Sequence, residues 1–251
     1  MIEIKNVTKH YDQNVVVNNV SLTLPSSGVT SIIGPNGAGK STLLSMISRL
    51  LPIDQGTITV DGLDVSKTPS DVLARRLSIL RQDNHLASRL TVKDLVTFGR
   101  YPYSKGRPTL EDQKHVMQAL GYLKLEDLQD RFLDELSGGQ RQRAFVAMVL
   151  CQDTDYVLLD EPLNNLDMKH AVAMMRLLRR TANELGKTIV LVLHDVNFAS
   201  CYSDYIVAMK NAEVVYQGTP QDILQPEVMH AIYEIDIDIQ EINDQRIAIY
   251  F

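Results

Sequence analysis

The segment from Val29 to Leu51 constrains the fold of this chain more than any other part of the sequence. It opens with a short apolar run, Val29 to Ile33, which has the length and composition of a buried β-strand. A glycine-rich stretch follows, and after it Leu43, Leu44 and Ile47 recur at helical spacing. Because a strand that passes through a short turn into a helix is the building unit of parallel α/β sheets, we expect an α/β fold.

The glycine-rich stretch fits the spacing G-x-x-x-x-G-K-[ST] of a phosphate-binding loop. Its glycines allow the backbone to wrap a phosphate, so that successive N–H groups and the N-terminus of the following helix point at it. In such a loop Lys40 reaches the β- and γ-phosphates and the Ser41 hydroxyl holds Mg²⁺. The alternative, an ordinary glycine-rich turn, is disfavoured by the strand before it and the helix after it. The predicted nucleotide-binding residues are Gly34, Pro35, Asn36, Gly37, Ala38, Gly39, Lys40, Ser41 and Thr42.

A second group of candidate residues stands at the ends of two later apolar runs. The run Tyr156–Asp160 has the pattern of a buried strand and is followed directly by Glu161. Ligands of α/β sheets bind at the carboxyl ends of parallel strands, so Asp160 is placed to support Mg²⁺ and Glu161 to polarise an attacking water. His194 ends the run Ile189–Leu193, and near a γ-phosphate it would orient the transition state. Taken alone, the carboxylates also fit a helix cap or a solvated turn, and a lone histidine at a strand end is more often structural.

The rest of the chain alternates between strand and helix patterns. Residues Met1–Leu24 alternate apolar and polar side chains, which predicts half-buried antiparallel strands. From about Asn84 to Ala147 the pattern is mostly helical, with loop signals at Tyr101-Pro102 and Lys105–Pro108, and we interpret it as an inserted helical subdomain. Further strands are predicted at 56–65, with a turn at Asp61-Gly62, and at 77–80, 188–193, 205–210 and 213–217. A helix is predicted at 168–185, with Asp167 as its N-cap and Gly186 just past its end.

The composition limits the class of protein. With 251 residues, of which 45% are apolar and 22% charged, the chain has the balance of a folded globular domain. Its formal net charge of −6 argues against nucleic acid as a main partner. The longest apolar run, Ala144–Cys151, is far shorter than the roughly 20 residues that a membrane-spanning helix needs. The start Met1–Lys5 has an acidic residue, Glu3, where a secretory signal would have a basic region, and Cys151 and Cys201 fit no disulfide or zinc pattern. We therefore expect a cytoplasmic protein with two buried thiols.

The segment Leu136–Arg143 distinguishes between the families that share a phosphate-binding loop. It reads Leu-Ser-Gly-Gly-Gln-Arg-Gln-Arg. Ser137-Gly138-Gly139 stand just ahead of a helical run, Gln140–Cys151, so their backbone N–H groups form a second anion site at a positive helix end. The segment resembles the signature of ABC-type ATPases, upstream of Asp160-Glu161 at that family's usual spacing. The resemblance covers nearly the whole chain, and the further matching residues are Tyr11 (adenine stacking), Gln82 (Q-loop), Asp167 (D-loop) and His194 (H-loop). It adds Ser137, Gly138, Gly139 and Gln140 to the predicted nucleotide-binding set.

The resemblance implies a fold, a set of cofactors and a dimer. The fold is an α/β P-loop NTPase core with an N-terminal antiparallel β-layer, an inserted helical subdomain at 84–147 and a short C-terminal extension at 218–251, all within one ATPase domain spanning 1–251. The cofactors are ATP and Mg²⁺, with the metal near Ser41, Gln82 and Asp160; Glu161 is the general base, and His194 and Lys40 complete the catalytic set. In this family two subunits face head to tail, and the signature of one closes on the ATP held by the other. One loop and one signature per chain therefore predict a symmetric homodimer with two ATP.

Two positions depart from the family pattern. Asn165 stands near the D-loop, where the family often has a small or hydroxyl residue, and this bears on communication between subunits rather than on hydrolysis. Asp12 follows Tyr11 where glycine is frequent, which matters little for ring stacking. All positions assigned to hydrolysis are filled.

The segment Leu90–Tyr103 indicates what the ATPase drives. Its end, Gly99-Arg100-Tyr101-Pro102-Tyr103, resembles the helical subdomain of ATPases that serve iron-siderophore, haem and vitamin B12 importers. The run Leu193–Asn197, followed by Ala199 and Tyr202, is similar to that subgroup too. We favour the ATPase of a ferric-siderophore importer. The alternatives are the ATPase of a haem or vitamin B12 importer, a soluble non-transport ABC ATPase and a non-hydrolysing regulatory nucleotide binder. The resemblance implies a homodimer beneath two integral-membrane permease subunits, peripheral on the cytoplasmic side of the cell inner (plasma) membrane. A substrate-binding protein outside would feed it, and the chain would touch the membrane through the permease only.

Overall fold

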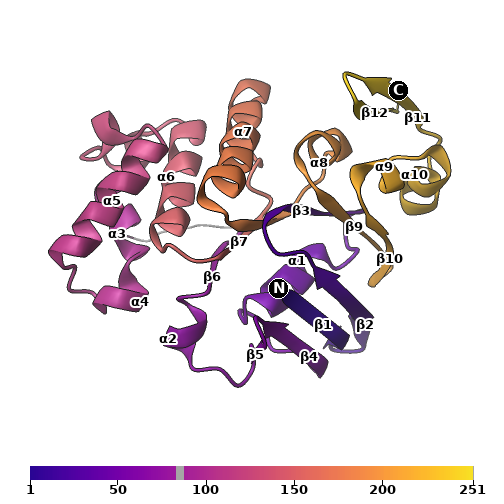
Figure 1. The fold of residues 1–251 in the computed structure, drawn as a ribbon, viewed down its shortest axis with the longest axis horizontal. Coiled ribbons are helices and arrows are strands. Elements are labelled where there is room, and N and C mark those ends of the chain that lie inside the picture. The colour runs from indigo at the N-terminus through magenta and orange to yellow at the C-terminus, as the bar shows by residue number, and fades with distance from the viewer. Residues whose placement is uncertain (83–87, 251) are drawn as a thin grey trace. The chain divides into compact units, whose positions relative to one another are not determined.

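A computed structural model of the chain describes residues 1–82 and 88–250. The chain divides into two compact units. The first comprises Met1–Thr68 and Arg179–Phe251, and the second Pro69–Leu178. The predicted start of a helical insertion at Asn84 lies outside the described residues, and its bounds stay a prediction. Figure 1 labels the elements of both units.

The N-terminal layer of the first unit is an antiparallel sheet in the order β2-β1-β4-β5. Its strands are β1 (Ile2–Tyr11), β2 (Asn14–Leu24), β4 (Gln55–Val60) and β5 (Leu63–Asp64). Ile2 and Ile4 are buried and the intervening Glu3 is half-buried, which is the period-2 pattern of a sheet with one covered face. Between β4 and β5, Asp61 and Gly62 both have positive φ (50° and 78°), as a two-residue hairpin turn requires. The predicted antiparallel layer and its turn are confirmed.

The second sheet of the first unit runs in the order β10-β9-β3-β8. Strand β3 (Gly28–Ile33) pairs in parallel with β8 (Thr188–Val192) on one side and β9 (Tyr205–Lys210) on the other. Strand β10 (Glu213–Gly218) forms an antiparallel hairpin with β9. All five residues of β8 are buried, which accounts for its continuous apolar sequence. The carboxyl ends of β3 and β8 therefore meet at one edge of the sheet.

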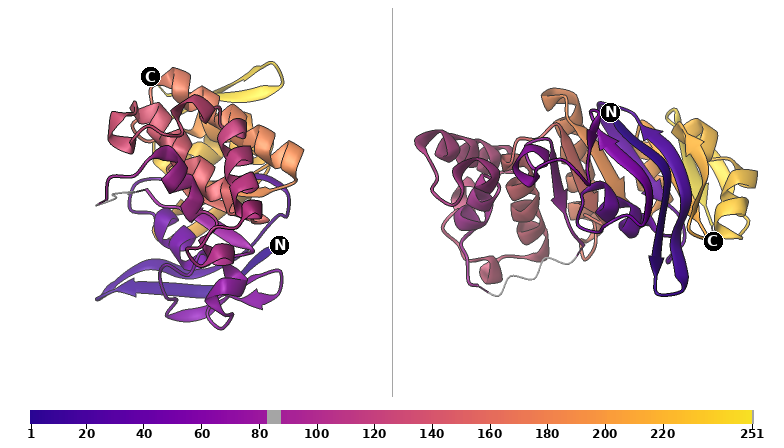
Figure 2. Two further views of the ribbon diagram at one scale, coloured as in Figure 1. Left: turned by 90° about the vertical axis from the view of Figure 1, so that its left-hand side faces the viewer. Right: turned by 90° about the horizontal axis from the view of Figure 1, so that it is seen from below.

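Further helices and a hairpin complete the first unit. They are α1 (Lys40–Ile47), the part of α7 (Met168–Leu185) from Arg179 onward, α8 (Val196–Tyr202), α9 (Pro220–Ile223), α10 (Pro226–Tyr233) and the hairpin of β11 (Asp238–Ile242) with β12 (Gln245–Ile249). The hairpin is fixed to α8 by the Asn197 side chain, which donates to the Ala248 carbonyl (3.0 Å) and accepts from the Ala248 N–H (2.7 Å). Figure 2 shows this hairpin in yellow.

The second unit combines a pair of parallel strands with helices. Strand β6 (Leu77–Leu80) pairs with β7 (Tyr156–Asp160), and both have the bounds that the sequence predicts. The helices are α2 (Ser70–Leu73), α3 (Val92–Phe98), α4 (Tyr101–Ser104), α5 (Leu110–Tyr122), α6 (Gly138–Cys151) and the start of α7 (Met168–Leu185), with short 3₁₀ turns at Glu126–Leu128 and Leu133–Glu135. Helices α3 and α5 both pack on α6.

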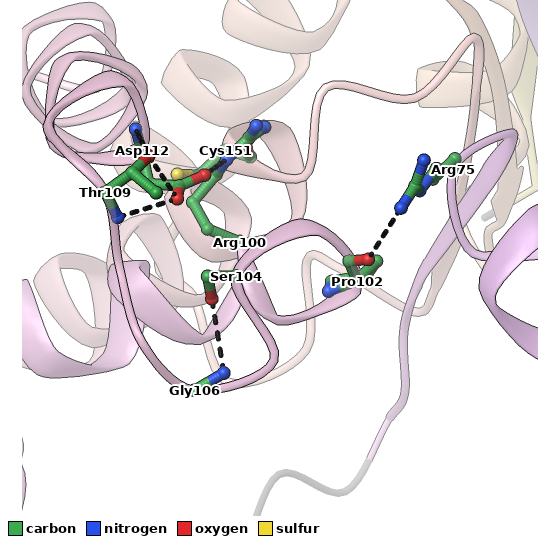
Figure 3. A network of polar contacts seen from close by, with 8 residues as sticks. All are labelled: Arg75, Arg100, Pro102, Ser104, Gly106, Thr109, Asp112 and Cys151. Atoms are coloured by element: carbon green, nitrogen blue, oxygen red, sulfur yellow. Dashed lines mark hydrogen bonds and ion pairs between the residues drawn. The ribbon is translucent and has the colours of Figure 1, made fainter.

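A buried arginine joins three of these helices (Figure 3). The Arg100 guanidinium is 2.9 Å from the Asp112 carboxylate, donates to the Cys151 carbonyl (3.0 Å), and lies 3.9 Å from the centre of the Tyr103 ring. Burial raises the pKa of Asp112, but hydrogen bonds from Thr109 and Arg100 outweigh it, so the pKa is below its ordinary value. Arg100 therefore ties the start of α5 and the end of α6 to α4.

Two sequence expectations are wrong. Tyr101-Pro102, predicted as loop, begins the short helix α4 instead, because proline is tolerated in the first turn, where no helical hydrogen bond is lost. Cys151 is buried as predicted, whereas Cys201 on α8 is partly exposed.

Candidate active site

The glycine-rich loop of the first unit joins β3 to α1. Helix α1 begins at Lys40, and Gly39 is its N-cap. The Lys40 side chain is buried, and its ammonium donates to the carbonyl oxygens of Gly34 (2.8 Å) and Pro35 (2.9 Å). The charge is therefore fixed against the first residues of the loop, next to the place where the loop would hold a phosphate.

Two glycines of the loop admit no side chain. Gly34 has φ 139°, and a Cβ there would lie 2.0 Å from the Met209 carbonyl oxygen on β9. Gly39 has φ 96°, and its Cβ would lie 2.3 Å from the Val16 carbonyl oxygen on β2. Because backbone occupies both positions, the loop keeps its path only with glycine. These residues fit the phosphate cradle that the sequence predicts.

His194 and Tyr11 belong to the same unit as the loop. The Leu193 N–H donates to the Ile32 carbonyl (3.1 Å), which brings the end of β8, and with it His194, beside the end of β3. His194 is exposed, and the next residue, Asp195, caps α8 by accepting from two backbone N–H groups. Tyr11 ends β1 with about half of its side chain exposed, a position that leaves an aromatic face open to a ligand.

The two carboxylates lie at the end of β7 in the second unit. Asp160 is buried, and Glu161 follows it with a left-handed backbone (φ 49°), an uncommon conformation for a residue with a side chain. The Gln82 amide donates to Glu161 Oε2 (2.7 Å), and the Asn164 amide donates to the same oxygen. Two amides thus hold the carboxylate in one orientation. Sequence reasoning identified Gln82 but missed Asn164, because a turn-forming asparagine carries no signal of such a contact.

The predicted signature begins a helix of the second unit. Ser137 is the N-cap of α6: its hydroxyl accepts from the Gln140 N–H (3.3 Å), and the Gln140 side chain accepts from the Ser137 N–H (2.9 Å). This capping box fixes the start of the helix at Gly138, two residues before the predicted start at Gln140, with Ser137 just ahead of the helix as predicted. The helix end with Gly138 and Gly139 therefore has the partial positive charge of an anion-binding end.

Asp167 is the N-cap of α7, also as predicted. Its Oδ1 accepts from the His170 backbone N–H (2.8 Å) and from the His170 ring at Nδ1 (2.7 Å). These two hydrogen bonds, the backbone one first, lower the pKa of the Asp167 carboxyl. His170 is a second residue that sequence reasoning missed, although its place three residues after an N-cap is where a side chain can reach back.

The predicted site residues are thus divided between the two units. The first unit contains the loop residues, Tyr11 and His194. The second unit contains Gln82, Asp160, Glu161, the signature and Asp167. Within residues 1–82 and 88–250, no cluster of three His, Cys, Asp or Glu side chains is suited to hold a metal by itself. Asp160 by itself offers one buried carboxylate, and Mg²⁺ usually takes further ligands from phosphates and water.

The family model described as "ABC transporter" matches residues 17–164 of the sequence. The chain belongs to the ABC transporter family. It is 57% identical over 251 residues, the full length of both chains, to the petrobactin import ATP-binding protein YclP of Bacillus subtilis (strain 168). It is 53% identical over 250 residues to the petrobactin import ATP-binding protein FatE of Bacillus anthracis, again with full coverage of both.

A solved structure agrees with this family assignment. A dimeric ATP-binding cassette in a post-hydrolysis state, bound to ADP and Pi, superposes with a TM-score of 0.78 at 30% identity, over 88% of this chain and 99% of that one. The predicted fold class and the predicted ABC-type ATPase are confirmed. In the part of the chain that the structure describes, no helix is long and apolar enough to cross a membrane.

Proposed function

We propose that this chain is the ATP-hydrolysing subunit of an importer for an iron–siderophore complex, with ferric petrobactin as the first candidate. The observation that carries the proposal is full-length agreement, at 57% and 53% identity, with two ATP-binding proteins of petrobactin import. The segment Leu90–Tyr103 supports the same class of substrate. A haem or vitamin B12 importer is the nearest alternative, and a soluble non-transport ABC ATPase is a more distant one.

In this proposal ATP binds on the glycine-rich loop. The backbone N–H groups of residues 34–42 hold the β- and γ-phosphates, Lys40 neutralises their charge, and Tyr11 stacks on adenine. Ser41, Asp160 and Gln82 are the residues that would hold Mg²⁺, which when bound offsets further phosphate charge. The glycines Gly34 and Gly39 support this assignment, since neighbouring backbone excludes any side chain at these two positions and the loop keeps its path only with glycine.

Hydrolysis is an in-line attack of water on the γ-phosphate. Glu161 accepts a proton from the water as the new oxygen–phosphorus bond forms, and the bond to the β–γ bridging oxygen breaks to release ADP. Gln82 and Asn164 support this role of Glu161 because they fix the orientation of its carboxylate. His194 orients the γ-phosphate, and positioning with electrostatics supplies most of the rate.

The working form is a homodimer that binds two ATP. The signature residues Ser137, Gly138, Gly139 and Gln140 of each subunit would close on the ATP held by the other, and Asp167 would lie at the same interface. The capping box at Ser137 supports this role because it presents the N-terminal N–H groups of α6. The dimeric state of the similar ATP-binding cassette, with ADP and Pi bound, supports it as well.

Two ATPase subunits would work beneath two integral-membrane permease subunits, with a substrate-binding protein outside. The chain would then be peripheral, on the cytoplasmic side of the cell inner (plasma) membrane. The second unit offers exposed apolar side chains for such a contact: Phe98 is 52% exposed and Tyr101 is 58% exposed. The siderophore would cross through the permease and never touch this chain.

Uptake by iron-starved source cells tests the proposal. Cells would carry either the wild-type chain or Glu161→Gln as their only copy, and labelled ferric petrobactin, other ferric siderophores, haem and vitamin B12 would be offered in turn. We expect Glu161→Gln to abolish uptake of ferric petrobactin and leave haem and vitamin B12 uptake unchanged. Unchanged uptake of every siderophore would overturn the assignment to siderophore import.

A further inference from the structure

The segment between Glu161 and α7 lies against the first turn of α6. Gln142 on α6 donates its side-chain amide to the Pro162 carbonyl (2.9 Å). A Cβ on Gly138 would lie 3.6 Å from the Asn165 carbonyl oxygen, which is ordinary van der Waals contact. Residues 162–167 end in the D-loop aspartate, Asp167. This segment and the signature helix are therefore in contact within a single chain.

A third contact, made by His170, is much closer. A Cβ on Gly139 would lie 2.6 Å from His170 Cδ2 and 2.8 Å from Cγ, distances that real Cβ atoms do not reach. Gly139 itself has an ordinary helical backbone, since its φ is not among the positive ones. The requirement for glycine at this position therefore comes from the His170 ring and not from the backbone conformation.

The His170 ring cannot easily turn away from Gly139. Its Nδ1 is 2.7 Å from Asp167 Oδ1, and the same carboxylate oxygen accepts from the His170 backbone N–H (2.8 Å). Because a carboxylate only accepts, the ring donates from Nδ1, and the backbone hydrogen bond fixes the carboxylate that holds it. The backbone hydrogen bond alone would cap α7, so the contact through the ring is additional to the cap.

We propose that His170 is a positioning residue that holds the D-loop and the signature as one body. On one side its ring fixes the Asp167 carboxylate, and on the other it fills the space above Gly139. This rests on the proposed function, in which both segments of one subunit face the ATP of the other. If either segment shifted against the other, the dimer would close with one of them misplaced.

The first test separates ATP binding from turnover. His170→Ala in the full chain is expected to lower kcat about tenfold or more, because misplacing a positioning group by about 1 Å costs that much, while KM for MgATP stays within about twofold. His170→Asn, whose amide can replace Nδ1 as a donor to Asp167, is expected to recover a large part of kcat. The matched control is His115→Ala, because His115 is a histidine on α5 of the same unit. We expect this variant to keep the wild-type kcat. A kcat of His170→Ala equal to that of His115→Ala would overturn the proposal, and so would a failure of His170→Asn to exceed His170→Ala.

The second test measures the contact without any enzymatic activity. Gly139→Ala should lower Tm by about 2–4 °C or more, since the new methyl group and the held ring compete for one space. In the double variant Gly139→Ala/His170→Ala we expect most of this loss to disappear. An additive double variant would show that the ring does not exclude a side chain at Gly139. Because Tm needs no ATP or partner, this result stands even if the chain proves not to hydrolyse ATP, which would count against the proposed function alone.

Discussion

At the scale of single residues, the chemistry centres on how the Glu161 carboxylate is held. Its backbone is left-handed, which places the side chain in a direction that a strand or helix would not give. Amides of Gln82 and Asn164 both donate to Oε2. A general base needs a fixed orientation, and these two amides, both within the second unit, supply one for the base proposed at Glu161.

Asn164→Ala tests whether this orientation matters. With one of two amides removed, the carboxylate gains freedom, and we expect kcat to fall about tenfold with KM for ATP unchanged. Asn183→Ala, at an exposed asparagine on α7, is the control and should retain wild-type turnover. The measurement is steady-state hydrolysis of MgATP. A kcat of Asn164→Ala within twofold of the control would show that the Asn164 amide is not needed to position the base.

Residue by residue, sequence reasoning located the groups with strong signals and missed those defined by contact. The loop glycines and Lys40 are specified by spacing, and Ser137 by its place before a helix. Asn164 and His170 follow no such pattern. Their proposed roles depend on contacts that form only in the folded chain, with Glu161 for Asn164 and with Gly139 for His170. Asn165, which departs from the family pattern, has φ 60°, and asparagine is among the residues that adopt this conformation most readily.

At the scale of elements, the buried pair of Arg100 and Asp112 holds the helices of the second unit together. Both side chains are about 5% exposed, and Arg100 also reaches the last residue of α6. Removing one partner of a buried pair leaves an uncompensated charge. The helical packing around α4 therefore depends on this pair.

Arg100→Ala is expected to lower the free energy of unfolding by about 3–5 kcal/mol. Arg89→Ala is the matched control, because Arg89 pairs with Asp134 and Glu135 at the surface, where such pairs contribute at most about 1 kcal/mol. Urea unfolding followed by circular dichroism measures both. Equal losses in the two variants would contradict the structural role of the buried pair.

The lowered pKa of Asp112 predicts a pH dependence. A carboxyl whose pKa is lower in the folded state contributes stability that is full above its unfolded pKa of about 3.9 and is lost as the pH falls through the folded value. Asp112→Asn should therefore lower the free energy of unfolding most near pH 7. The difference in this free energy between the variant and the wild type should shrink below about pH 4. The measurement is urea unfolding as a function of pH. A difference that stays constant from pH 7 to pH 3 would mean that Asp112 is not charged in the folded protein.

Element boundaries followed from the sequence where the pattern was continuous. Strands β6 and β7 and helix α7 have the predicted bounds because an apolar run or a capping residue marks each end. Helix α4 was missed because Tyr101-Pro102 carries a turn signal, whereas its neighbours, above all Arg100, stabilise a helical turn there. Contacts of this kind lie between segments distant in sequence, so no local pattern reports them.

At the level of the whole molecule, the proposed function requires that two copies of the chain close on ATP. Glu161→Gln keeps the shape of the side chain and removes its basicity, so we expect turnover to fall by about 10²–10⁴ while ATP still binds. The variant should then accumulate as an ATP-bound dimer, which light scattering after gel filtration detects. Adding Lys40→Ala should return it to the monomer, since Lys40 is needed to hold the phosphates. A Glu161→Gln chain that stays monomeric in saturating MgATP would argue against the dimer.

Hydrolysis by this chain is proposed to drive siderophore import, and ATP turnover in the assembled importer tests this coupling. The chain would be purified with its permease from the source cells, reconstituted in liposomes, and assayed with and without substrate-binding protein loaded with ferric petrobactin. We predict that the loaded binding protein raises turnover several-fold for the wild-type chain, and that Glu161→Gln shows no turnover in either condition. Turnover that is the same with loaded and with empty binding protein would contradict the coupling of ATP hydrolysis to siderophore import.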